Sequence, residues 1–121
     1  MIKGIGIDLI ELDRIEKSLK KNDKLANRVL TMKEKKKFLQ LKSSHRRAEF
    51  LAGRFAAKEA FAKAAGTGIG ELSFQHIEVL SDENGAPSIK VKGYESVNIF
   101  ISITHSREYA AAQIVIEDKP S

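Results

Sequence analysis

The 121-residue chain contains no cysteine and no tryptophan, only two prolines and two tyrosines, and no apolar stretch of eighteen residues. Without cysteine the chain can form no disulfide, no thiolate metal site and no cysteine nucleophile. Without a long apolar run it offers no candidate transmembrane helix. The N-terminal segment MIKGIGIDLIELD also lacks the apolar core and cleavage site of a signal peptide. These absences predict a cytoplasmic protein.

The charge of the chain is distributed unevenly around its net value of +5. Residues 1–66 contain 17 Lys and Arg against 8 Asp and Glu, which gives +9, whereas residues 67–121 contain 4 against 8, which gives −4. A basic half predicts an acidic partner, which is a nucleic acid, a phosphate-rich ligand or an acidic protein. The length predicts one domain, small enough that assembly with copies of itself would bury further apolar surface.

The first half of the chain is predicted to be a strand followed by helices. Residues 2–10 have the composition of a strand, and helices are predicted over 11–21, 24–30, 32–41 and about 46–65. Thr31 and Glu34 have the spacing of a capping box, and Ser43-Ser44 precede the long helix. Gly66 stands where a helix C-terminus favours glycine.

The second half is predicted to form two hairpins. Strands are expected over 74–81, 87–93, 97–106 and 109–118, and Asn84-Gly85 is typical of the tight turn between the first two. The sequence therefore predicts a single small α+β domain over residues 1–117, in which a mainly antiparallel sheet packs against the long helix. Residues 118–121 are expected to be a C-terminal tail.

The segment RFAAKEAFAKAAGTGIG, residues 54–70, has the alanine and phenylalanine content of a packed helix but carries Lys58, Glu59 and Lys63. On a helical wheel, the side expected to face the core carries Phe50, Gly53, Ala57, Ala60, Phe61 and Ala64. Glu59 and Lys63 lie on another side, among small apolar residues. One interpretation is a weak surface ion pair between them. The other is that Glu59 binds a divalent metal, nearby cations bind phosphate, and the alanines leave room for the ligand.

A metal bound by Glu59 needs a second acidic ligand, and Asp8 is the best candidate. Asp8 interrupts the apolar strand GIGIDLI, where an acid contributes little to stability. Mg²⁺ usually takes one or two protein carboxylates together with waters and phosphate oxygens. The alternative is that Asp8 caps the helix that follows the strand.

The segment ISITHSREYA places several polar groups at the end of an apolar strand. Alternation puts Ser102, Thr104 and Ser106 on one face and Ile103 and His105 on the other. A lone histidine is more often structural than catalytic. A Ser/His/Asp triad is disfavoured because no nucleophile-elbow glycine pattern surrounds a serine. GTGIG follows a helix instead of opening one, so it indicates a helix end more than a phosphate loop.

Three segments together resemble bacterial holo-[acyl-carrier-protein] synthase, the small 4′-phosphopantetheinyl transferase of fatty acid synthesis. They are GIGIDLIELDRI, EFLAGRFAAKEAFAKAAGTGIG and SITHSREYA, and they cover almost the whole chain in the right order. The helix motif is an aromatic residue, then Lys-Glu-Ala, then a second lysine, met here by Phe55, Lys58–Ala60 and Lys63. Gly6 and Asp8 meet the early Gly-x-Asp of the family.

The resemblance implies transfer of the 4′-phosphopantetheine arm of coenzyme A to a serine hydroxyl of apo acyl carrier protein, with release of adenosine 3′,5′-bisphosphate. Asp8 and Glu59 match the family's Mg²⁺ ligands, and Lys63 matches the lysine that neutralises the phosphate under attack. Glu59, Lys63 and His105 are the expected catalytic residues. The expected contacts to coenzyme A are Arg46, Arg54, Lys63, Gly66, Thr104 and His105. The proton of the serine could pass to Glu59, to a metal-bound water or to His105, and the sequence leaves these open.

The resemblance also implies two kinds of protein contact. The family is a homotrimer with active sites between subunits, so Asp8 and Glu59 need not meet within one chain. It docks the acidic carrier protein against the first helical region, where basic residues recur at spacings of three or four. They are Arg14, Lys17, Lys21, Lys24 and Arg28. The alternative for this run is an ordinary solvated helix face.

Two other functions compete with the transferase. A basic nucleic-acid-binding module would use MKEKKKF and the first helix, but the chain lacks tryptophan and any recognised docking motif. A purely structural trimer would use Glu59 and Lys63 as an interface ion pair. The transferase is the preferred interpretation, with neither nucleic acid nor membrane expected as a partner.

Overall fold

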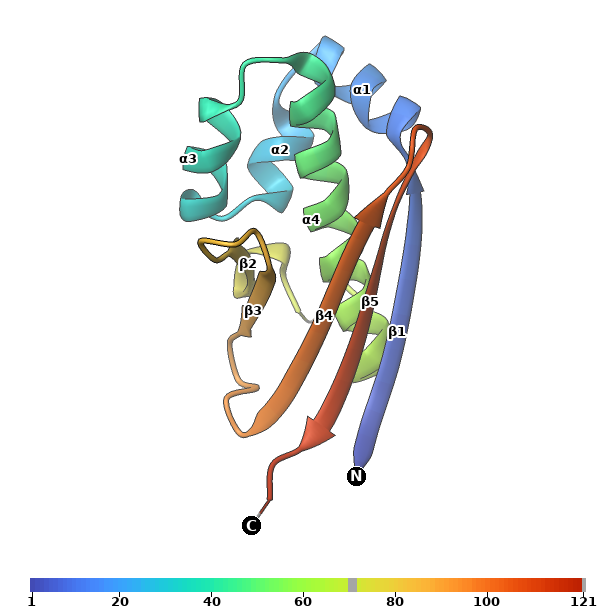
Figure 1. Ribbon diagram of the computed structural model, residues 1–121, viewed down its shortest axis with the longest axis vertical. Helices are drawn as coiled ribbons and strands as arrows, with labels where there is room; N and C mark the ends of the chain where they lie inside the picture. The colour runs from blue at the N-terminus through green and yellow to red at the C-terminus, as the bar shows by residue number, and fades with distance from the viewer. Residues whose placement is uncertain (70–71, 121) are drawn as a thin grey trace.

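The computed structural model describes residues 1–69 and 72–120, so Gly70 of GTGIG and Ser121 of the expected tail lie outside the described residues. The elements follow the predicted order of a strand, helices and two hairpins (Figure 1). They are β1 (Ile2–Glu11), α1 (Leu12–Lys21), α2 (Lys24–Val29), α3 (Met32–Gln40), α4 (Ser44–Ala65), the short 3₁₀ helix η1 (Phe74–His76), β2 (Ile77–Ser81), β3 (Pro87–Val91), β4 (Val97–His105) and β5 (Tyr109–Asp118). The predicted α+β class is confirmed.

The strands form two antiparallel sheets. The larger sheet has the order β1-β5-β4, and the smaller one is the hairpin β2-β3. Both predicted hairpins are present, and Gly85 in the turn of the first has φ +83°. Residues 74–76 were expected to begin a strand but form η1, because the Ser73 side chain accepts from the Gln75 backbone N–H and starts a tight helical turn.

Helix α4 packs directly on β1 at two glycines. A Cβ atom added to Gly6 would lie 1.9 Å from the carbonyl oxygen of Ala60, and one added to Gly4 would lie 2.0 Å from that of Ala64. The two backbones can approach this closely only because neither glycine has a side chain. Asp8 is the next residue on the same face of β1, so this packing directs its carboxylate toward α4.

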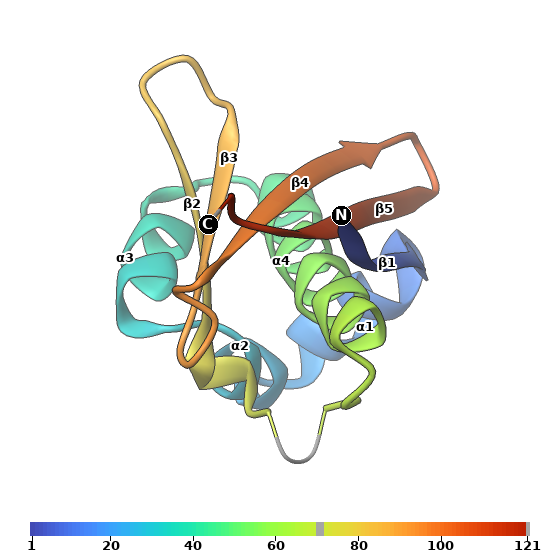
Figure 2. The same ribbon diagram turned by 90° about the horizontal axis from the view of Figure 1, so that it is seen from below.

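Helix α4 is buried on more sides than the helical wheel predicted. Ala52 and Ala56, on the side assigned to Glu59, are as fully buried as Ala57 and Ala60 on the side assigned to the core. The reason is that α4 contacts β1, β4 and β5 on one side and α2, α3 and β2 on the other (Figure 2). The expectation that these alanines leave room for a ligand is therefore wrong, because protein fills the space.

The predicted capping residues of α3 and α4 are confirmed, although α4 begins at Ser44 and not at about residue 46. Thr31 and Glu34 form a complete capping box on α3. The Ser43 hydroxyl accepts from the Arg46 backbone N–H, and Gly66 ends α4 with φ +76°. Among residues 1–69 and 72–120, no helix is both long and apolar enough to cross a bilayer.

Candidate active site

Asp8 and Lys63 meet where β1 crosses the C-terminal part of α4. The Lys63 ammonium donates to Asp8 Oδ1 at 2.9 Å and to the Ile7 carbonyl at 3.1 Å. Lys63 therefore pairs with Asp8, so the alternative of a surface ion pair between Glu59 and Lys63 is wrong. The capping role considered for Asp8 is also wrong, since the N-cap of α1 is Glu11.

Glu59 lies on α4 one turn before Lys63, and it is close enough to Asp8 for the negative charge of Asp8 to affect its pKa. Burial raises the pKa of Glu59, and the negative charge of Asp8 raises it further, whereas Lys63 and Arg28 oppose the shift. Asp8 and Glu59 thus approach each other within a single chain. We call Asp8, Glu59 and Lys63 the carboxylate cluster.

The chemistry of the carboxylate cluster suits a hard divalent cation. Two carboxylates that repel each other would both be stabilised by such an ion. Within the described ranges, no three His, Asp or Glu side chains gather as a metal site. Mg²⁺ takes one or two protein carboxylates and completes its shell with water and phosphate oxygens. Asp8 and Glu59 could hold this ion.

A second group of predicted residues lines a cavity of about 280 Å³ between α4, the β2-β3 hairpin and the end of β4. Arg46, Arg54 and His105 all face it, and we call these three residues the cation cluster. The acidic Glu49 also lines the cavity. Ile103 also lines the cavity, so the predicted alternation of Ile103 and His105 on one face is confirmed.

Arg54 is the most unusual member of the cation cluster because its guanidinium is buried without a full set of partners. Its side chain stacks on the Phe50 ring at 4.0 Å and donates to the Ser81 hydroxyl at 3.3 Å. In the part of the chain that the structure describes, Arg54 Nε has no hydrogen-bond partner. Burial lowers the pKa of Arg54, although the charge of Glu34 opposes this. An anion in the cavity would supply the missing acceptor.

Arg46 and Arg47 are adjacent in sequence, but only Arg46 faces the cavity. The Arg47 guanidinium donates to the carbonyls of Leu41 and Leu39 at 2.8 and 3.2 Å and lies over the Phe38 ring. Arg47 therefore stabilises the C-terminal end of α3, and Arg46 is the one exposed to a ligand.

Two expected coenzyme A contacts lie away from the cation cluster. Gly66 directly follows α4, three residues after Lys63, and so lies nearer the carboxylate cluster. Thr104 is exposed on the face of β4 opposite to His105. Within one chain, β5 separates Asp8 on β1 from His105 on β4, since Ala112 of β5 pairs with both Asp8 and Ile103. The two clusters are therefore distinct.

The sequence did not predict the pairing of Lys58 with Glu34 or any role for Glu49. Lys58 and Glu34 are both fully buried, and Lys58 Nζ lies 2.6 Å from Glu34 Oε1. Glu49 contacts His105 from α4 at 3.3 Å. Only the four-residue spacing of His45 and Glu49 in α4 offered a sequence signal for the latter.

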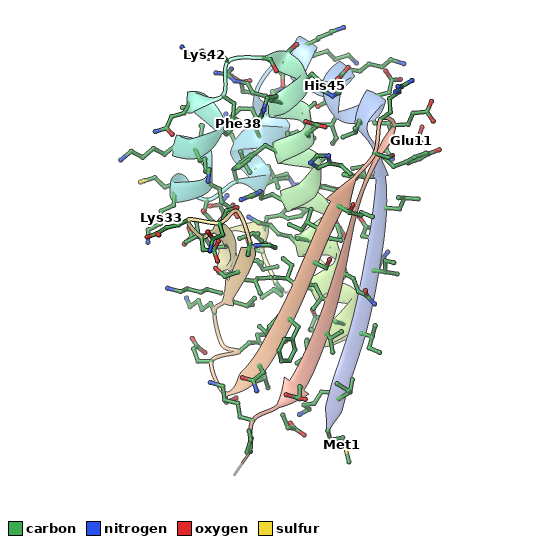
Figure 3. All side chains as sticks on the ribbon, viewed as in Figure 1. Met1, Glu11, Lys33, Phe38, Lys42 and His45 are labelled. Carbon is green, nitrogen blue, oxygen red and sulfur yellow. The ribbon has the colours of Figure 1, made fainter. Side chains whose placement is uncertain are left out.

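The five expected carrier-binding residues lie on α1 and α2, and all are exposed. Lys17 pairs with Asp13 at 2.9 Å, and this contact raises the pKa of Lys17. Arg28 lies over the Phe74 ring at 5.4 Å. Lysines of α3 and its C-terminal end, among them Lys33 and Lys42, form a separate exposed basic region (Figure 3).

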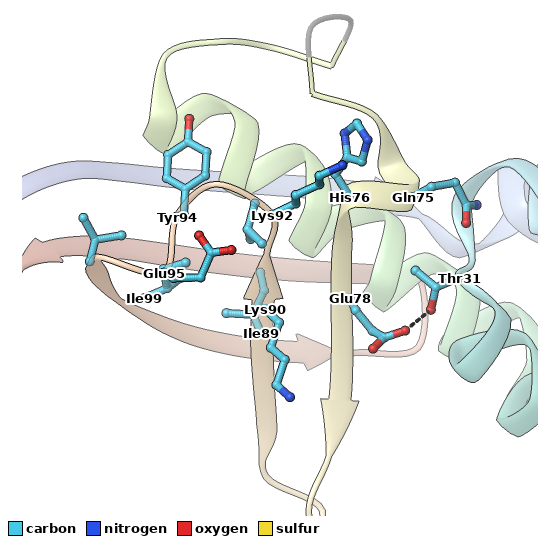
Figure 4. A pocket seen from close by; sticks show the side chains of 12 residues that line it. Thr31, Gln75, His76, Glu78, Ile89, Lys90, Lys92, Tyr94, Glu95 and Ile99 are labelled. Atoms are coloured by element: carbon cyan, nitrogen blue, oxygen red, sulfur yellow. Dashed lines mark hydrogen bonds between the residues drawn. The ribbon is translucent and has the colours of Figure 1, made fainter.

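A larger cavity of about 580 Å³ lies between the β2-β3 hairpin and the start of β4 (Figure 4). Its polar lining includes Thr31 and Glu78, which hydrogen-bond to each other at 2.6 Å. None of the predicted site residues lines it. Its size alone therefore does not make it the candidate site.

A model of the 4′-phosphopantetheinyl transferase superfamily matches residues 4–114. The chain is 52% identical over 119 residues to a holo-[acyl-carrier-protein] synthase of Oceanobacillus iheyensis, covering 98% of this chain and 99% of the relative. It is 57% identical over 118 residues to the synthase of Geobacillus kaustophilus, covering 97% of this chain and 90% of that one.

The fold is also similar to a solved structure. The crystal structure of a holo-(acyl-carrier-protein) synthase from Bacillus anthracis, in complex with CoA (3′,5′-ADP), superposes with a TM-score of 0.88 at 51% sequence identity. The match covers 98% of this chain and 99% of that chain. Similarity of sequence and similarity of fold therefore both extend over nearly the whole length.

Proposed function

This chain belongs to the holo-[acyl-carrier-protein] synthases of the 4′-phosphopantetheinyl transferase superfamily, and we propose that its reaction is Mg²⁺-dependent and uses both clusters. The oxygen of a serine in apo acyl carrier protein bonds to the phosphorus that carries pantetheine. The bond from that phosphorus to the bridging oxygen breaks, and adenosine 3′,5′-bisphosphate leaves. The observation that carries the proposal is the buried Arg54 guanidinium with an unpaired Nε, found in the described residues beside Arg46 and His105.

The carboxylate cluster is proposed to serve the reacting phosphate. Asp8 and Glu59 would hold Mg²⁺, which polarises phosphoryl oxygens and stabilises the leaving group. Lys63 already lies 2.9 Å from Asp8, so its ammonium is close enough to neutralise charge on a phosphate oxygen bound there. The serine proton needs an acceptor, which would be Glu59, a water bound to the metal, or His105.

The cation cluster is proposed to bind the nucleotide end of coenzyme A. A pyrophosphate and a 3′-phosphate need several cations, and Arg46 and Arg54 face one cavity together. A relative from Bacillus anthracis was crystallised with CoA (3′,5′-ADP), which supports the same ligand here. Gly66 and Thr104 stay predictions as coenzyme A contacts.

A homotrimer is proposed to bring the two clusters together across copies. The outward face of the larger sheet exposes Ile5, Ile7, Leu9 and Phe100, each more than half exposed. Ile5 and Phe100 both pair with Val115, so the apolar surface runs across all three strands. Exposed apolar surface of this kind marks an interface. A neighbour seated there could place its cation cluster against this chain's carboxylate cluster.

The basic residues of α1 and α2 are proposed to dock the acidic carrier protein. Their exposure leaves them free to steer its approach. A role in fatty acid synthesis and a cytoplasmic location remain predictions from the sequence.

Intact-mass spectrometry of an apo acyl carrier protein tests the function. Incubation with this protein, coenzyme A and Mg²⁺ is expected to add about 340 Da, the mass of the phosphopantetheinyl group, to the carrier. The gain should disappear in EDTA. No gain with a correctly folded carrier would contradict the proposed reaction.

A further inference from the structure

Glu49 contacts two histidines with one carboxylate oxygen. Its Oε2 lies 3.3 Å from Nδ1 of His105 and 3.5 Å from Nε2 of His45. His45 Nδ1 in turn lies at hydrogen-bond distance, 3.0 Å, from Glu16 Oε1 on α1. Four side chains thus form a continuous series from β4 through α4 to α1, which we call the Glu16–His105 chain. Figure 3 labels His45, which lies at the sheet end where α1 and α4 approach each other.

The position of the Glu49 carboxylate beside Nδ1 favours one tautomer of the neutral His105 ring. A neutral imidazole carries its proton on one nitrogen only, and a carboxylate beside Nδ1 selects the form with the proton there. The lone pair is then on Nε2, at the other side of the ring. Such outer partners orient a functional histidine and fix its tautomer.

The position of Glu49 suits this role. Its side chain is largely buried, with 22% exposed, and it lines the same cavity as Arg46 and Arg54. Lys37 also lines this cavity. The Glu49 carboxylate therefore lies among cationic side chains. Of its two contacts with imidazole rings, the one with His105 is shorter, and His105 lines the same cavity.

We propose that Glu49 is a positioning residue that holds His105 with Nε2 available to the substrate. The proposal rests on the proposed function, in which His105 serves coenzyme A.

The first test is ¹⁵N NMR of the histidine rings in the full chain, which has three histidines. Wild-type His105 should carry its proton on Nδ1 when neutral. In Glu49→Gln an amide replaces the carboxylate, and the Nδ1–H form should lose its dominance. Glu16→Gln is the matched control, since it breaks only the far contact to His45 and should leave the His105 signals unchanged. A His105 ring that keeps its tautomer in Glu49→Gln would overturn the proposal.

The second test is kinetic and separates positioning from folding. Glu49→Gln should lower kcat about tenfold at an unchanged midpoint of thermal unfolding, within the range known for orienting partners. In a His105→Ala background the same change should have no further effect, because Glu49 acts through that ring. An equal loss in both backgrounds would assign Glu49 a purely structural role. The NMR test needs no turnover, so failure of the transferase reaction and failure of this proposal are distinguishable.

Discussion

The Lys58 ammonium lies 2.6 Å from Glu34 Oε1, and neither side chain has exposed surface. Lys58 also donates to the carbonyls of Val29 and Phe74, at 2.6 and 3.1 Å. The second oxygen of Glu34 accepts from the Val79 backbone N–H at 2.7 Å. This one buried pair therefore ties α4 to α2, α3, η1 and β2, in the turn of α4 that also carries Glu59.

Removing Lys58 alone should destabilise the fold strongly. Lys58→Met leaves a buried carboxylate without its cation, and breaking a buried ion pair in this way costs about 3–5 kcal/mol. Urea unfolding measures the loss. The double variant Glu34→Gln with Lys58→Met should recover part of it. Lys3→Met is the control, because the Lys3–Asp118 pair is exposed and should leave the unfolding midpoint unchanged. A small loss for Lys58→Met would contradict the proposed importance of the pair.

Arg54 should be required for nucleotide affinity in a way that charge alone cannot replace. Arg54→Lys keeps the charge but loses the planar donors that reach Ser81 and the unpaired Nε position. We expect the affinity for coenzyme A, measured by calorimetry, to fall about tenfold, which is the loss of one charge-assisted hydrogen bond. Arg47→Lys is the matched change outside the cavity and should leave the affinity unaltered. Equal affinities for Arg54→Lys and wild type would rule out this assignment.

Glu59 should make the metal-free protein less stable as the pH rises. Its pKa is raised above the ordinary value of 4.5 by burial and by Asp8. The stability contributed by neutral Glu59 is fully present below 4.5 and is lost as the pH rises through the raised pKa. Thermal unfolding in EDTA across this window measures the loss. Glu59→Gln stays neutral and should show less of it, so identical pH profiles for the two proteins would refute the prediction.

Arg14 should act on the carrier protein and not on coenzyme A. Arg14→Glu reverses an exposed charge on α1 and should raise the KM for apo acyl carrier protein while leaving the affinity for coenzyme A unchanged. Lys36→Glu makes the same kind of charge reversal on the exposed side of α3. If both variants raise the KM equally, the carrier protein responds to the overall positive charge of residues 1–66 and not to a docking site on α1.

Local features of the fold were predictable because they depend on neighbours in sequence. The capping box of Thr31 and Glu34 and the glycine that ends α4 follow from spacings of a few residues, and both are present. The extra role of Glu34 was not predictable, because its partner Lys58 is 24 residues away on another helix. Nothing in the sequence says that a capping carboxylate also neutralises a buried ammonium.

The candidate site likewise contains residues that the sequence predicted and contacts that it did not. The motif residues Asp8 and Glu59 were found from the sequence, whereas the pairing of Lys63 with Asp8 depends on how β1 crosses α4 at Gly4 and Gly6. The alanines beside Glu59 were misinterpreted because a helical wheel assigns one buried side, and α4 is covered from several directions. Contacts of this kind need the packed structure.

The central claim is that the carboxylate cluster of one chain works with the cation cluster of another. The most direct test mixes the Glu59→Gln and His105→Ala variants into shared assemblies. The activity of each variant measured alone gives the baseline. In a random three-fold mixture, about a quarter of the interfaces join an intact Glu59 to an intact His105. The account predicts that mixing restores mass transfer to the carrier protein above both baselines. Activity that stays at the baselines in confirmed mixed assemblies would contradict it and would confine both clusters to one chain.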